Sequence, residues 1–508
     1  MELDPVKGPG VLPVEMERSK SRCEGEMFEV KKGFSRLTIL SMTVVLMATW
    51  EALSSSMVSG LVSGGPVSLV YGYLLAVVGA LATAASLAEL ASMYPTAGGQ
   101  YHFTAILVPE RIRNALSWAV GWIGTFGWIA FAASAPFFAA TMLQGVIVLN
   151  HESYGMDRWQ GTLIYWALVA LATAINIWGS RLLSLVESVS LLIHVCAFIA
   201  IFTVLWVCSP DKHSAEFVFT TFLNSSGWSS DGVAWSIGML SSCYVLTGYD
   251  GAIHLGEEMS YPAMEVPYCM LGSVILNGAM GFAFLVALLF CMGDINAALS
   301  SPTGYPFIEI FRSVTGSRAA SSVMTLVVIL TALLATIALI ASAARMVWSL
   351  ARDKALPFHD HLAKIHPRTQ MPVRAILATS GVLVLLGAVN IGSTTALNAI
   401  ISLAVLGLQV SYLIPVTLML WRRLSSAKSI LIYGPWQLGA LGVPTNIVSL
   451  LYLSYTTIFM VFPPYQPVTA ENMNYSSLIF GAVLIVSAVY WVCAGRKQYT
   501  GPRIEIPY

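Results

Sequence analysis

The chain has 508 residues, of which 56% are hydrophobic and only 10% are charged. An ordinary soluble domain has about 25% charged residues, so this composition excludes a typical soluble protein and predicts an all-α polytopic membrane protein. The basic residues form no cluster interleaved with aromatic residues outside the apolar runs, so nucleic acid is not an expected partner.

Twelve runs are long and apolar enough to cross a bilayer, which takes about 20 residues of helix. They cover residues 37–61, 69–92, 115–147, 161–178, 187–208, 233–255, 269–292, 322–350, 375–391, 395–420, 441–462 and 477–495. We therefore expect a transmembrane domain over residues 37–495. It is flanked by a cytoplasmic N-terminal tail, residues 1–36, and a cytoplasmic C-terminal tail, residues 496–508.

Basic residues are retained on the cytoplasmic side of a membrane, so their positions predict the orientation. With the N-terminus inside, 22 of the 26 Lys and Arg residues fall in cytoplasmic segments. The remaining four are Arg158, Lys212, Arg312 and Arg318. The opposite orientation would reverse this distribution, so both termini are expected in the cytoplasm.

Two of the runs are interrupted by polar residues and glycines. The first contains Thr49, Glu51 and a group of serines, and the sixth contains the stretch Gly248 to Gly251. Broken helices survive in a bilayer where they line a cavity. Interruptions in runs one and six are the spacing expected of a 5+5 inverted repeat with two extra C-terminal helices, the architecture in which broken helices 1 and 6 bind substrate and ions.

Sequence motifs along the chain carry a family resemblance. The stretch "ELASMYPTAGGQYHFTAILVP" after the second run resembles a motif of the amino acid/polyamine/organocation (APC) transporter superfamily. Residues 176–188, 248–270, 341–375 and 433–475 resemble further segments of its amino acid/choline branch, which includes fungal GABA and choline permeases. The similar segments follow one another in order through most of the chain.

The resemblance implies a secondary active transporter of amino acids or related amines such as GABA, choline or polyamines. We expect proton coupling, alternating access, no cofactor, and a location in the plasma membrane, with the vacuolar membrane as the alternative. An exchanger or facilitator without proton coupling and a transporter-like nutrient sensor are the competing functions. The chain contains no P-loop, HExxH or GxSxG motif, so an enzyme is not expected.

Glu51 is the first candidate site residue. An ionised carboxylate at the bilayer centre costs at least about 2.5 kcal/mol unless it meets a partner or water. We expect Glu51 to bind a substrate ammonium, with Trp50 as a cation-π surface and Thr49 and Ser54 beside it. The alternative is a protonated acid that forms hydrogen bonds between helices.

Asp250 lies between glycines where the sixth helix is expected to unwind. In APC relatives this position holds an acid linked to gating or proton coupling, and that role is predicted here, with Gly248, Tyr249 and Gly251 lining the substrate site. The alternative is a side-chain cap on the broken helix.

His194 is the third candidate, because a histidine titrates near neutral pH. It lies in the fifth run at a position where some proton-coupled relatives carry Lys, which implies a role in proton coupling. The alternative is a packing residue. The loop histidines His359, His361 and His366 lack the usual spacing of a zinc site, so no metal is expected.

Overall fold

The computed structural model describes residues 34–179, 183–392, 395–425 and 431–502, and these residues are almost entirely helical. Most of the expected N-terminal tail (residues 1–33) and the end of the expected C-terminal tail (residues 503–508) lie outside the described residues.

The first half of the described chain runs from α1 to η2, just after the sixth segment. Its elements are α1 (Arg36–Met47), α2 (Thr49–Ser56), α3 (Val58–Val62), β1 (Ser63–Gly64), α4 (Gly65–Met93), α5 (Gln100–Leu107), η1 (Glu110–Ile112), α6 (Arg113–Asn150), α7 (Arg158–Trp178), α8 (Leu183–Cys208), α9 (Ala215–Thr220), β2 (Leu223–Asn224), α10 (Asp231–Gly238), α11 (Leu240–Val245), α12 (Gly251–His254) and η2 (Gly256–Glu258).

The second half begins after η2 and contains the remaining long helices. Its elements are α13 (Pro262–Phe290), α14 (Ile295–Leu299), α15 (Pro306–Thr315), α16 (Arg318–Arg352), α17 (His359–Leu362), α18 (Val373–Gly392), α19 (Thr395–Leu424), η4 (Gly439–Leu441), α20 (Gly442–Phe459), α21 (Ser476–Tyr490), the π-helical η5 (Trp491–Gly495) and α22 (Arg496–Gln498).

Within these described ranges, ten helices are long and apolar enough to cross a membrane. This confirms a polytopic helical membrane protein. Two of the twelve expected spans, residues 233–255 and 441–462, are not among the ten. The former is divided into the short helices α10, α11 and α12, and the latter corresponds to the 18-residue helix α20, which has buried polar residues on one face.

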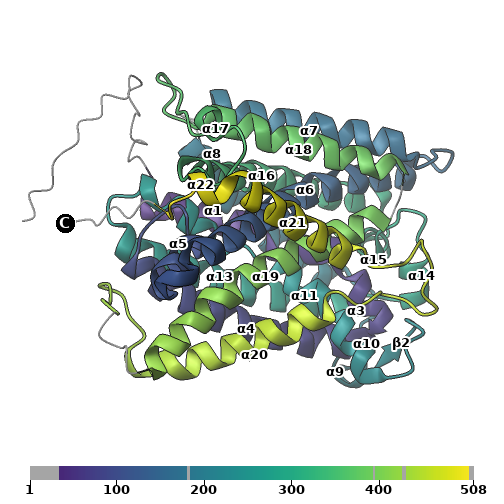
Figure 1. The fold of residues 1–508 in the computed structure, drawn as a ribbon. Coiled ribbons are helices and arrows are strands. Elements are labelled where there is room, and N and C mark those ends of the chain that lie inside the picture. The colour runs from purple at the N-terminus through teal and green to yellow at the C-terminus, as the bar shows by residue number, and fades with distance from the viewer. Residues whose placement is uncertain (1–33, 180–182, 393–394, 426–430, 503–508) are drawn as a thin grey trace, which may run out of the picture.

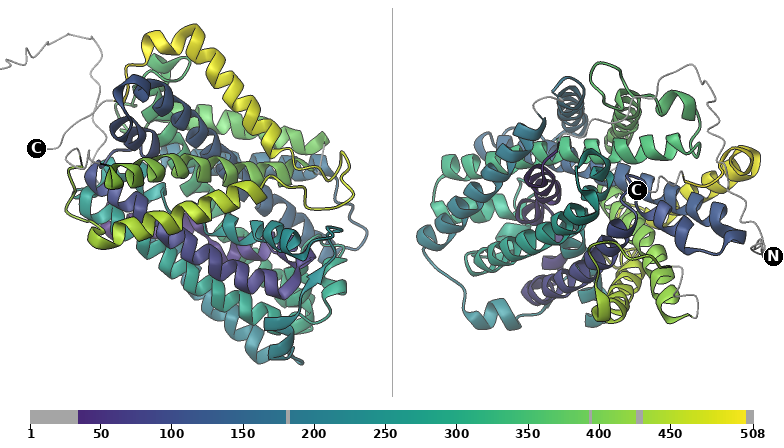
Figure 2. Two further views of the ribbon diagram at one scale, coloured as in Figure 1. Left: turned by 60° about the horizontal axis from the view of Figure 1, so that its bottom comes forward. Right: turned by 90° about the vertical axis from the view of Figure 1, so that its left-hand side faces the viewer.

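The long helices form one bundle in which α6, α16 and α19 are central. Helix α6 packs against both α16 and α19, while α13 and α20 pack against α4, and α18 packs against α7. Figure 1 shows α7 and α18 along one edge of the bundle and α4 and α20 along the opposite edge. Figure 2 shows the same bundle from two further directions.

Glycines permit the closest approach at the centre of the bundle. A Cβ atom at Gly127 of α6 would lie 2.9 Å from the backbone nitrogen of Leu408, and one at Gly407 of α19 would lie 2.9 Å from the Gly127 Cα. Small residues at such crossings let helix backbones meet. The two glycines therefore fix the contact between α6 and α19.

The first and sixth segments are joined at both ends. At one end β1 pairs antiparallel with β2, with Ser63 opposite Asn224 and Gly64 opposite Leu223. At the other end Phe34 forms an isolated bridge with Met259. Two segments far apart in the sequence are thus held side by side along their length, and their breaks lie together between these two attachments.

Candidate functional site

The first helix breaks at Ala48. This residue has φ +40°, in the left-handed region that is uncommon for residues other than glycine. Asn277 of α13 bridges the break, since its Oδ1 accepts from the Thr49 backbone N–H at 3.4 Å and its Nδ2 donates to the Val44 carbonyl at 3.1 Å. A backbone outlier that the surrounding structure holds in place is typical of a functional site.

The sixth segment breaks between α11 and α12, at residues 246–250. Gly248 has φ +106°, and a Cβ atom there would lie 2.6 Å from Phe131 and 2.7 Å from Leu46. The Thr49 hydroxyl donates to the Val245 carbonyl, the last of α11, at 2.8 Å. The exposed helix ends at the two breaks are therefore hydrogen-bonded to each other, as broken helices in a membrane require.

Glu51 and His194 form a buried pair. The Nδ1 atom of His194, on α8, lies 2.7 Å from Oε1 of Glu51, on α2, and both side chains are almost inaccessible to solvent. A contact this short requires a proton on one of the two groups. Glu51 Oε2 and His194 Nε2 form no hydrogen bond to any described residue. The pair thus keeps one free oxygen and one free ring nitrogen.

The Trp50 indole lies beside this pair, within an aromatic cluster. Its ring centroid is 6.1 Å from that of His194, 6.3 Å from that of Phe198 and 5.3 Å from that of Phe284. The indole is fully buried. Trp50 therefore packs against the His194 ring and holds the orientation of the imidazole.

Asp250 is fully buried and accepts three hydrogen bonds from uncharged donors. Tyr412 of α19 donates to Oδ1 at 2.6 Å, and Gln100 of α5 and Trp128 of α6 donate to Oδ2 at 2.7 and 3.1 Å. The Asp250 side chain does not cap α12. The carboxylate instead joins the break in the sixth segment to three other helices.

His254, one turn after Asp250, also lies close to that carboxylate. Its Nδ1 donates to the Ala97 carbonyl at 2.8 Å, and its Nε2 lies 3.5 Å from Asp250 Oδ2. Because a carbonyl can only accept, Nδ1 carries the proton of a neutral ring. His254 would donate to Asp250 only after taking up a second proton.

A small cavity of about 30 Å³ lies at the first break. It is lined by Ala48 and Glu51, by residues of α6 and α16, and by Phe138 and Tyr244. A larger cavity of about 440 Å³ shares Ser55, Phe138 and Tyr244 with it. The two cavities therefore meet at these three side chains.

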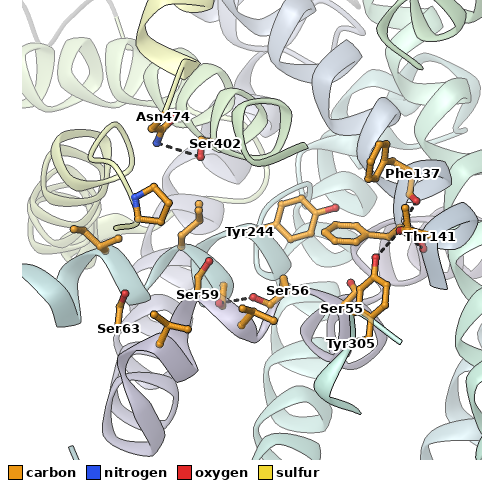
Figure 3. Close-up of a pocket in the computed structure, with 18 of the residues that line it drawn as sticks. Ser55, Ser56, Ser59, Ser63, Phe137, Thr141, Tyr244, Tyr305, Ser402 and Asn474 are labelled. Atoms are coloured by element: carbon orange, nitrogen blue, oxygen red, sulfur yellow. Dashed lines mark hydrogen bonds between the residues drawn. The ribbon is translucent and has the colours of Figure 1, made fainter. Parts of the chain in front are cut away.

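The larger cavity has a wall of serines. Ser55, Ser56, Ser59 and Ser63 face it from the first segment, and Thr141, Tyr305 and Asn474 from other elements. Figure 3 shows these residues around the cavity, together with Tyr244. The Tyr244 hydroxyl is 2.6 Å from Ser134 Oγ, which fixes the ring between the two cavities. No acidic side chain is among the residues that line the larger cavity, so Glu51 is the first carboxylate that a molecule would meet.

The structure separates the predicted substrate residues into two groups. Glu51 lines the small cavity, whereas the other six line neither cavity and lie in the walls around the two breaks: Thr49, Trp50, Ser54, Gly248, Tyr249 and Gly251. Tyr249 packs against Tyr412 with a centroid distance of 5.7 Å. Sequence reasoning did not select Ser55, Phe138 or Tyr244. Helical spacing could have indicated Ser55, because it follows Glu51 by four residues on one face.

Ion pairs close the end of the bundle opposite the larger cavity. Arg345 of α16 pairs with Glu258, and both side chains are buried. Arg352 binds both oxygens of Glu257 at 3.0 and 3.1 Å, and Glu257 also accepts from the Ala97 N–H at 2.9 Å. Although burial acts to raise the pKa of Glu257, the Arg352 guanidinium holds it below its ordinary value. These pairs tie the end of the sixth segment to α16.

Comparison with known proteins identifies the family. The family model for amino acid permeases matches residues 33–485. The chain belongs to the amino acid permease family. This confirms the resemblance to the APC superfamily and supports a membrane transporter rather than an enzyme.

Several curated relatives of this permease come from fungi. The chain is 35% identical to a putative amino acid/polyamine transporter of Macrophomina phaseolina over 432 residues, which covers 85% of this chain and 95% of the relative. It is 31% identical to a choline transporter of Saccharomyces cerevisiae (94% of this chain, 84% of the relative) and 31% identical to amino-acid permease 2 of Neurospora crassa (94% and 87%). These relatives have different substrates in their names.

Proposed function

We propose that this permease is a proton-coupled secondary transporter of an amino acid or a related amine, such as choline, GABA or a polyamine, and that it works by alternating access. The observation that carries the proposal is the position of Glu51. It lies at a helix break, lines a cavity, and is paired with His194, whose imidazole ring can carry either one proton or two.

Glu51 is proposed to bind the substrate ammonium. One of its oxygens is held by His194, and the other has no partner among the described residues. A carboxylate accepts several hydrogen bonds, so the free oxygen is available to an ammonium group. Phe131, Phe138 and Tyr244 line the same cavity and supply aromatic faces for a cation. This environment favours a substrate with an exposed ammonium over an apolar amino acid side chain.

His194 is proposed to carry the coupled proton. A protonated imidazole and an ionised Glu51 form a neutral buried pair, whereas the loss of that proton leaves the carboxylate with its full charge. The charge of the pair therefore depends on the proton and on the substrate ammonium together. Both ligands act on one carboxylate, which is the physical basis for coupling their movement.

We further propose that twelve spans form a 5+5 inverted repeat with two additional helices, that α10 to α12 form the sixth span, and that α20 forms the eleventh. The distribution of Lys and Arg supports cytoplasmic termini. We also propose that the protein is located in the plasma membrane. In this orientation the larger cavity opens outward. The pairs of Glu257 and Glu258 with Arg352 and Arg345 then close the cytoplasmic side.

The test is uptake of radiolabelled choline, GABA, a polyamine and a panel of amino acids into cells that lack their own permeases. The proposal predicts accumulation of one class of amine against its gradient, and loss of that accumulation when a protonophore is added. If the substrate only reaches equal concentrations on both sides of the membrane and the protonophore has no effect on uptake, the protein is a facilitator or an exchanger. No transport of any amine by protein at the cell surface would favour a sensor.

A further inference from the structure

Glu187 is a buried carboxyl group outside the site described above. It lies in the first turns of α8 and is completely shielded from solvent. Neither of its oxygens forms a hydrogen bond to any described residue. Buried carboxylates in folded proteins are paired, because an isolated ionised carboxylate is very costly to bury. Glu187 is therefore either a neutral carboxyl group or a carboxylate that forms an ion pair in another conformation of the protein.

The charged group that acts on Glu187 is Arg345. This guanidinium lies within electrostatic range of the Glu187 carboxyl, and α16, which carries it, packs against α8. Arg345 is held by Glu258 in this structure. One cation therefore has two acidic neighbours and is bound to one of them.

The other helices that pack against α8 bring charged groups only near their ends. Arg36, at the start of α1, lies 4.5 Å above the Tyr268 ring of α13, and Glu265 is in the first turn of α13. At the far end, Glu309 and Arg312 of α15 bind each other. On α8 itself, His194 lies two turns beyond Glu187 and is bound to Glu51.

The balance of charge changes if the closed end of the bundle opens. While Arg345 and Glu258 are paired, the pair is neutral and Glu187 is most stable with its proton. Separation of α16 from the end of the sixth segment would leave Arg345 buried without a partner, which is strongly unfavourable. Ionisation of Glu187 would supply a new partner for Arg345, since α8 and α16 pack against each other.

We propose that Glu187 is a proton-binding site of the transport cycle, protonated while Arg345 is bound to Glu258 and ionised when Arg345 changes partner from Glu258 to Glu187. In this step the O–H bond of the Glu187 carboxyl breaks, the proton passes to water in the opened cytoplasmic cavity, and the carboxylate pairs with Arg345. One proton is released for each opening and is taken up again before the next. The inference rests on the proposed transport function and on the proposed orientation.

The experiment compares Glu187→Gln with the wild-type protein after purification and reconstitution into liposomes. Substrate exchange at equal pH on both sides needs no net proton release, whereas accumulation driven by a pH gradient does. The predicted result is retained exchange with loss of gradient-driven accumulation. Accumulation equal to that of the wild type would overturn the proposal. Glu265→Gln, which removes a carboxylate in the first turn of α13, is the matched control and should keep both activities.

A second variant, Glu187→Asp, tests the proposal if Glu187→Gln does not fold. Glu187→Asp keeps a carboxyl group but moves it away from Arg345, so it should accumulate substrate with a changed pH dependence while exchange stays normal. An unchanged pH profile for Glu187→Asp would overturn the proposal. Failure of the wider transport hypothesis is distinguishable, because the wild-type protein would then show no gradient-driven accumulation at all.

Discussion

Glu51 and His194 are separated by 143 positions in the sequence, and their side chains meet at 2.7 Å in the buried centre of the bundle. Each was a separate candidate from sequence, one for the substrate and one for the proton. Their contact makes the two roles interdependent, because a change in charge on either residue alters what the other can bind.

Replacing His194 by Asn should separate transport from proton coupling. The Asn side chain can still donate a hydrogen bond to Glu51, but it does not titrate. Substrate exchange is expected to continue, while accumulation against a gradient and its dependence on external pH should disappear. Uptake assays at two external pH values, with and without a protonophore, measure both properties. Accumulation like that of the wild type would show that His194 is only a packing residue.

Asp250→Asn should weaken the structure around the sixth break. The Asn amide group replaces one carboxylate oxygen with a nitrogen that cannot accept a hydrogen bond. At least one of the hydrogen bonds that Gln100, Trp128 and Tyr412 donate to Asp250 is therefore lost. Loss of hydrogen bonds to a buried charged group should lower the free energy of unfolding by about 3 kcal/mol. We expect slower transport at normal surface level, with the pH profile retained, as a gating residue requires.

Thermal unfolding of the purified protein and the pH profile of uptake test this role of Asp250. If the variant unfolds like the wild type but loses its response to pH, Asp250 carries the proton and the gating assignment is wrong. Glu265→Gln, a substitution of the same kind in the first turn of α13, serves as the control.

The small cavity should limit the size of the substrate. Ala332 lines it on α16, and a valine there would add two methyl groups to the wall of a space of about 30 Å³. Ala332→Val is therefore expected to raise KM, most for the bulkier substrates, with little change in stability. Ala338 of the same helix is fully buried and lines neither cavity, so Ala338→Val should instead destabilise the protein by about 1 to 3 kcal/mol. Equal KM values for Ala332→Val and the wild type would place the substrate elsewhere.

Acid should lower the stability of the folded protein through His102 of α5. Burial, reinforced by the Arg352 charge, lowers the pKa of His102 from 6.5 to about 4. In the unfolded chain this histidine takes up a proton near its ordinary pKa, whereas in the folded protein it remains neutral, so stability falls as the pH drops below 6.5. The expected loss at about pH 5 is roughly 2 kcal/mol.

His102→Asn should remove that part of the acid sensitivity, because asparagine does not titrate. Thermal unfolding near neutral pH and near about pH 5 measures the difference between the variant and the wild type. His151→Asn, at an exposed position, is the control. A variant that loses as much stability in acid as the wild type would contradict the assignment. Glu257 does not contribute in this range, because its pKa is held below the ordinary value and the group stays ionised.

The sequence predicted the membrane class and the two breaks because polar residues and glycines are conspicuous within apolar runs. It could not predict the partners across the bundle. Asp250 meets Gln100, Trp128 and Tyr412, which come from three other helices, and nothing in their local sequence marks them as partners. The left-handed backbone at Ala48 is imposed by contacts from α13, so alanine itself gives no local signal.

The sequence also could not predict which residues of α2 line the small cavity. Glu51 and Ser55 lie on one face of α2, whereas Trp50 and Ser54 precede them by one residue and point about 100° away around the helix. Proximity in sequence favoured Trp50 as a substrate residue, but the helical rotation directs it toward His194 and Phe284. Which face meets the cavity depends on packing between helices, and that information comes only from the three-dimensional structure.

The central claim is that Glu51 binds the substrate ammonium, and Glu51→Gln tests it most directly. The measurement is the KM for uptake of the transported amine by the wild type and the variant, at equal surface levels and at two pH values. Loss of a hydrogen bond to a charged group should weaken binding by about tenfold to a hundredfold. A KM equal to that of the wild type at both pH values would contradict the claim and make Glu51 a structural partner of His194.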